Sequence, residues 1–144
     1  MSKINIPILD NSGDTSVAST YIDDAATNGE ITAFFNAVNG MSIGTLVKSY
    51  VTQSIDKDAG SQVLPTNKYA RRENRFICHY SDVTTGKGYS FSIPCADLDL
   101  TTGDNVDMSS APAVSLKTAF EAMAVSEFGN AVTLNSIEYR GATY

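Results

Sequence analysis

Charged residues, cysteines and histidines are all scarce in this sequence, and each shortage argues against a class of protein. Charged residues fill 18% of the 144 positions, below the usual quarter or so. Two cysteines and one histidine are too few for a disulfide scaffold, or for a zinc site with about four nitrogen or sulfur ligands. We therefore expect reduced thiols, no metal and no cofactor.

Long hydrophobic runs are also missing. No apolar stretch approaches the ~20 residues of a membrane-spanning helix, and the first residues lack the apolar core of a secretory leader. The sequence therefore predicts a protein made in the cytoplasm of its producer, with no membrane partner.

Basic residues are outnumbered, because 10 lysines and arginines face 16 aspartates and glutamates, for a net charge of −6. Nucleic-acid binding needs a basic surplus on the contacting face, so this balance argues against it for the molecule as a whole. Four of the ten basic residues nevertheless fall within eight positions, together with a tyrosine. The candidate contact residues are Lys68, Tyr69, Arg71, Arg72 and Arg75. They suit either nucleic acid or the acidic segment 97–107 of an adjacent subunit, and the acidic surroundings favour the second.

The first half of the chain predicts a strand, a loop, a helix and a second strand. Alternating isoleucines place a strand over residues 3–9, and the polar stretch up to about residue 27 predicts a long loop with a helical turn near residues 21–24. Thr27 and Glu30 have the spacing of a capping box, which predicts the start of a helix. That helix carries Ile31, Phe34, Phe35 and Val38 on one face and ends near Gly40, and residues 43–55 predict a long strand.

The second half predicts a hairpin, a helix and a last strand. Apolar residues alternate with polar ones from Arg75 to about Leu98, around a turn at residues 83–88, so one face of the hairpin is apolar. A helix with Leu116, Ala119, Phe120 and Met123 on one face begins at Pro112 or Ser115 and ends at Gly129. Residues 131–140 predict the last strand.

Together these elements predict an α+β fold in one domain, residues 1–144, with a mostly antiparallel sheet of about five strands and two helices on one face. Two stretches also resemble each other. Ile6-Pro7 and Thr32-Ala33-Phe34 recur as Ile93-Pro94 and Thr118-Ala119-Phe120, with Thr45-Leu46 recurring as Thr133-Leu134. The repetition suggests two related strand-helix-strand halves, residues 1–60 and 75–144. The first strand lacks the hairpin partner of its counterpart, so we expect an exposed edge or pairing with another chain.

Several patterns in the sequence are superficially like functional motifs, and each favours a structural interpretation. Gly86-Lys87 lacks the remaining residues of a phosphate-binding loop, and the flanking strands indicate a hairpin turn. The acidic segment 97–107 has Thr102 and Met108 where a calcium loop needs glycine and glutamate.

His79 and the two cysteines also fit structural roles. His79 falls on the polar face of its strand, away from Cys78, because adjacent strand residues point to opposite faces. Cys78 and Cys95 share the apolar face, as small buried side chains or as neighbours able to form an adventitious disulfide. With no converging nucleophile and base, we expect no enzyme, no catalytic residue and no small-molecule substrate.

Three segments of the second half carry a resemblance: residues 75–82, residues 85–94 and residues 129–134. A Thr-Gly hairpin, an aromatic-alternating strand ending in Ile-Pro, and a late Gly-Asn-Ala-Val-Thr strand resemble small bacteriophage structural proteins of the coat or decoration type. The resemblance implies a virion subunit present in many copies, made in the host cytoplasm, that touches other capsid proteins or viral nucleic acid. We therefore expect a self-assembling structural protein. The alternative is a small cytosolic module that uses residues 68–75 to bind nucleic acid or an acidic protein.

Overall fold

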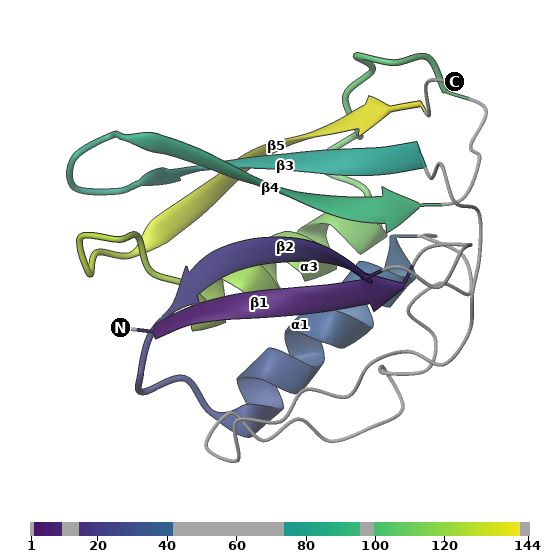
Figure 1. Cartoon of the computed structure of the whole chain (residues 1–144). Coiled ribbons are helices and arrows are strands. Elements are labelled where there is room, and N and C mark those ends of the chain that lie inside the picture. Colours follow the sequence, from purple (N-terminus) through teal and green to yellow (C-terminus); the bar gives the residue numbers. More distant parts are fainter. Residues whose placement is uncertain (1, 10–14, 42–73, 96–99, 142–144) are drawn as a thin grey trace.

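The computed structural model describes residues 2–9, 15–41, 74–95 and 100–141, which form an α+β fold (Figure 1). Within these ranges the chain forms five strands and two helices: β1 (Ser2–Leu9), β2 (Thr15–Ile22), α1 (Asn28–Gly40), β3 (Asn74–Asp82), β4 (Gly88–Cys95), α3 (Ala111–Met123) and β5 (Val132–Arg140). The expected strand over residues 43–55 lies outside the described residues.

Strands β4, β3 and β5 form an antiparallel sheet in that order. The predicted alternation is confirmed, because Phe76, Cys78 and Tyr80 are buried whereas His79 between them is exposed. Side chains of one face therefore enter the core, and the other face is polar. A register shift between His79 and Tyr80 bends the pairing of β3 with β5.

Strands β1 and β2 form a separate two-stranded antiparallel sheet, so the five strands do not make one continuous sheet. The predicted loop and helical turn are wrong for residues 15–22, which pair with β1 along its whole length. The expectation that the first strand lacks a hairpin partner is therefore wrong, because β1 pairs with β2 of the same chain. The polarity of segment 15–22 suggested a loop, yet Thr, Val and Tyr suit a strand once a neighbouring strand satisfies the backbone.

Helix α1 begins at the predicted capping box. The Thr27 amide donates to Glu30 Oε1 (2.9 Å), and the Glu30 amide donates to Thr27 Oγ1 (3.1 Å). The helix then buries Ile31, Phe34 and Val38, as its spacing predicts, and it ends at Gly40. The side chain of Phe35 lies outside the described ones.

Helix α3 starts with Pro112 in its first turn, as predicted, but it ends at Met123 and not at Gly129. Tertiary pairing stops it early. Ala124 is extended and forms an antiparallel bridge with Ile22 at the end of β2, while the Val125 amide donates to the Tyr21 carbonyl (3.1 Å). Gly129 (φ 82°) instead shapes the turn before β5.

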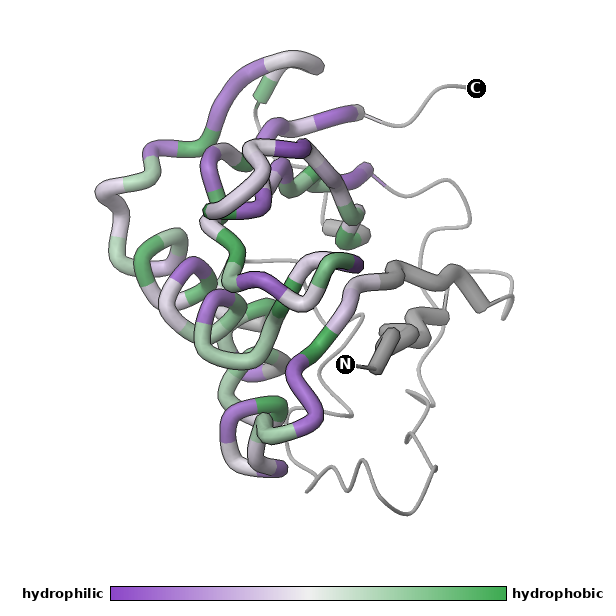
Figure 2. Tube along the Cα trace, turned by 90° about the vertical axis from the view of Figure 1, so that its left-hand side faces the viewer, coloured by the Kyte–Doolittle hydropathy of each residue, from purple (hydrophilic) through white to green (hydrophobic). Residues whose placement is uncertain are grey.

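The core lies between the helices and one face of the β4-β3-β5 sheet. Phe120 of α3 is fully buried. The centre of its ring lies 4.9 Å from the ring centres of both Tyr80 and Phe91, and 5.9 Å from that of Phe34 in α1. The helices gather on one side of the strands (Figure 2). Two helices on one face of a sheet is the predicted layer arrangement. The repeated phenylalanines, Phe34 and Phe120, meet each other there.

The outer edge of β5 is covered by residues 103–106 of the loop before α3. The Tyr139 amide and carbonyl bond to Asp104 and Gly103 (2.8 Å each), and the Val106 amide donates to the Ile137 carbonyl (2.8 Å). A covered edge does not offer its backbone to another chain. Intersubunit pairing along this half of β5 is therefore blocked.

Candidate interaction surfaces

Two loops lie against each other at one end of the molecule, which faces the viewer in Figure 2. We name this end the tip: the β3–β4 turn (residues 83–87) and the loop between α3 and β5 (residues 126–130). The buried carboxylate of Asp82 joins them, because it accepts bonds from the Ser126 hydroxyl and from Asn130 Nδ2 (3.1 and 3.3 Å). The amides of Thr84 and Thr85 donate to the same carboxylate (2.7 and 2.8 Å).

These bonds determine the charge state of Asp82. Burial by itself raises the pKa of a carboxyl group, but the bonds from Ser126, Thr85, Asn130 and Thr84 stabilise the charged form and lower the pKa of Asp82 to about 2. The carboxylate is ionised near neutral pH. It therefore acts as a fixed anchor for both loops.

The tip also carries an ion pair and an exposed aromatic ring. Lys87 Nζ lies 2.7 Å from Glu127 Oε1 and 5.2 Å from the centre of the Phe128 ring. The bond to Lys87 lowers the pKa of Glu127, and the same pairing raises the pKa of Lys87. Phe128 is 53% exposed and Val83, in the facing turn, is 63% exposed. The tip thus presents apolar side chains on a cross-linked support.

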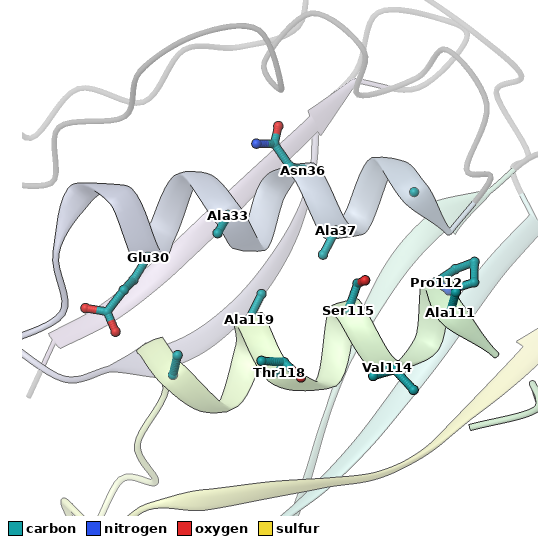
Figure 3. A pocket seen from close by; sticks show the side chains of 12 residues that line it. Glu30, Ala33, Asn36, Ala37, Ala111, Pro112, Val114, Ser115, Thr118 and Ala119 are labelled. Atoms are coloured by element: carbon teal, nitrogen blue, oxygen red, sulfur yellow. The ribbon is translucent and has the colours of Figure 1, made fainter. Parts of the chain in front are cut away.

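Helices α1 and α3 run antiparallel, and an open groove of about 770 Å³ lies along their outer side (Figure 3). Small residues of α1 such as Ala33 and Ala37 face Ser115 and Ala119 of α3 across it. Because these side chains are short, a hollow remains where longer ones would fill the space between the helices.

The groove is almost without charge. Among the described residues, Glu30 is the one charged member of the lining, and α3 contributes the exposed residues Ala111, Pro112, Val114, Ser115, Thr118 and Ala122. The charged residues of α3, Lys117 and Glu121, are part-exposed, pair with each other and lie outside this lining. Solvent-facing helix surfaces usually carry charged residues, whereas the centres of protein interfaces are depleted of them. This surface resembles an interface in its chemistry.

The predicted contact residues are mostly beyond what the structure describes. Lys68, Tyr69, Arg71 and Arg72 lie outside the described residues. Arg75 is the second residue of β3, where it is half-buried and its Nη1 donates to Ser92 Oγ (2.6 Å) across the strand pair. The basic segment therefore stays a prediction.

The other candidates of the sequence have structural roles. Gly86 (φ 75°) and Lys87 close the β3–β4 turn, as expected. In the acidic segment the Asp104 carboxylate accepts from the Thr101 amide (2.8 Å) and that of Asp107 from the Ser109 amide (2.9 Å), so both stabilise local turns. His79 is exposed, with Nε2 3.7 Å from Glu138 Oε1.

The two cysteines are not neighbours across the hairpin, so the alternative of an adventitious disulfide between them is wrong. Cys78 pairs with Phe91, and Cys95 pairs with Asn74, four residues further along β3. Four residues of strand span about 13 Å, well beyond the reach of a disulfide. Cys78 is a free thiol whose pKa is raised by complete burial, as expected of a small core residue.

Neither the tip nor the groove is predicted by the sequence. The spacing of alanines on the two helices hinted at the groove, but only their antiparallel pairing creates it. Nothing local indicated that Asp82 meets Ser126 and Asn130, which lie more than forty residues away.

Among the described residues, no set of three or more histidine, cysteine, aspartate or glutamate side chains is placed to hold a metal ion. None of the helices in these ranges has the length and apolar character needed to span a membrane. Comparisons with protein-family models, with curated proteins and with solved structures find no match.

Proposed function

We propose that this chain is a structural subunit of a virus particle that acts by assembling with other copies of itself. The main support for the proposal is the groove between α1 and α3, whose described lining has Glu30 as its one charged residue, on a molecule whose net charge is −6. Copies of an acidic protein repel each other, so they associate best through surfaces of little charge.

Three further features support assembly over chemistry. The polar cluster around Asp82 uses its bonds to join two loops. The sequence of residues 75–94 and 129–134 has the resemblance to small phage coat or decoration proteins described above. Low charge with many hydroxyl groups also suits subunits that pack closely. In this proposal the chain is one domain, built from two related halves, and needs no cofactor.

The groove gives the proposal a direct test. Ser115 is exposed within α3 and lines the groove, and Glu is a better helix former than Ser, so Ser115→Glu adds charge without disturbing the helix. We expect the wild-type protein to form large oligomers at micromolar concentration, measured by light scattering or sedimentation velocity. Ser115→Glu should weaken association more than about tenfold, because burying a lone charge at an interface is costly.

The matched control is Ser90→Glu, the same change on the exposed polar face of the sheet. It should assemble like the wild type. A wild-type protein that stays monomeric throughout this range contradicts the proposal.

The alternative of a binding module that uses residues 68–75 gains no support from the described residues, since Arg75 bonds within its own sheet. Salt-sensitive binding lost on changing Arg71, Arg72 and Arg75 to Ala would favour it.

A further inference from the structure

The tip has the properties of a rigid apolar projection. Four large hydrophobic residues are exposed in the described chain, and two of them, Val83 and Phe128, are on the tip. Their loops are fixed by the Asp82 cluster and by the Val83 amide, which donates to the Ala131 carbonyl (3.0 Å). Docking such a surface costs little conformational entropy, because its backbone is already ordered.

A third exposed hydrophobic residue, Val114, lines the groove. A cavity of about 770 Å³ is in the range that accommodates compact apolar ligands, and therefore has room for a phenyl ring and a neighbouring side chain. The groove and the tip are thus two apolar features of the described surface, one concave and one projecting.

The two surfaces supply one pair of opposite charges. Glu30 is the charged residue of the groove, while Lys87 holds an ammonium group beside the Phe128 ring. Lys87 also bonds to Glu127, but an ammonium group has three donors and keeps capacity for a second carboxylate.

We infer that the tip of one copy docks into the α1–α3 groove of the next copy, with Phe128 inside the groove and Lys87 directed at Glu30. This inference rests on the proposed self-assembly and names its contact. Packing two grooves against each other is the alternative, but it supplies no cation to Glu30 and leaves Phe128 and Val83 in water. Because the two surfaces differ, the contact is head-to-tail and repeats to give a ring or a filament.

The test uses two variants and their mixture. Phe128→Ser removes the tip contact and keeps the groove, whereas Ser115→Glu blocks the groove and keeps the tip. Both positions are exposed, so both proteins should fold, which circular dichroism and thermal unfolding will verify. Each variant alone should be monomeric by sedimentation velocity. An equimolar mixture should form dimers with one copy of each and nothing larger, since only one productive contact is left.

The control is Leu100→Ser, which removes an exposed large hydrophobic residue that is in neither surface and should assemble like the wild type. If Phe128→Ser assembles normally while Ser115→Glu does not, the groove binds something other than the tip, and the inference is wrong although self-assembly stands. A mixture that stays monomeric also overturns it. A monomeric wild-type protein removes the proposed function and the inference together.

Discussion

The tip and the groove are apolar surfaces that keep their shapes by opposite means. The tip depends on polar bonds, with Asp82 accepting from two loops while Lys87 pairs with Glu127. The groove depends on short side chains of two helices whose opposite faces are anchored in the core by residues such as Phe34 and Phe120. The two surfaces should therefore be disrupted by different perturbations: the tip by loss of charge, and the groove by loss of core packing.

The largest effect should come from removing the core support of the groove. Phe120 is fully buried among Phe34, Tyr80 and Phe91, so Phe120→Ala leaves a cavity and should lower the free energy of unfolding by about 3–5 kcal/mol. Phe128→Ala removes the same ring from an exposed site and should cost about 1 kcal/mol or less. Urea unfolding measures both, and equal losses would contradict the distinction between the two phenylalanines.

The second-largest effect should come from low pH, which should destabilise the tip. The pKa of Asp82 is lowered from 3.8 to about 2 on folding, so its ionised form stabilises the folded state above pH 4. That stabilisation should disappear as the pH falls from about 4 to about 2. Asp82→Asn, which does not titrate, should be less stable than the wild type at pH 6, and the difference should shrink toward pH 2.

Urea midpoints measured for both proteins between pH 2 and pH 6 give that difference directly. A difference that stays constant across this range would show that the charge of Asp82 does not hold the tip together.

The smallest effect should come from the charge of the groove. Glu30→Gln removes the carboxylate, but glutamine also serves in a capping box, so the start of α1 is kept. We expect unchanged thermal stability and association weakened about two- to fivefold, typical of an exposed ion pair. The difference in association between Glu30→Gln and the wild type should vanish in high salt. Unchanged association at low salt would argue against Lys87 as the partner of Glu30.

The sequence by itself determined the elements whose signals are local. Thr27 and Glu30 are three residues apart, so their reciprocal bonds specify where α1 starts without help from the rest of the chain. The alternation from Phe76 to Tyr80 likewise specified a strand with one buried face. The low content of charged residues is also a property of the sequence alone, and it predicts surfaces that can pack closely against other subunits.

Only the tertiary structure decided the features that depend on partners distant in the chain. Residues 15–22 form a strand because β1 is beside them, and α3 ends at Met123 because Ala124 pairs with Ile22. The register of β3 with β4 separates Cys78 from Cys95, and the meeting of Asp82 with Ser126 creates the tip. Each of these features depends on a contact between residues far apart in the sequence, and that contact outweighs the local conformational preference of the segment. A short stretch of sequence contains only one of the two residues in contact, so it does not predict the feature.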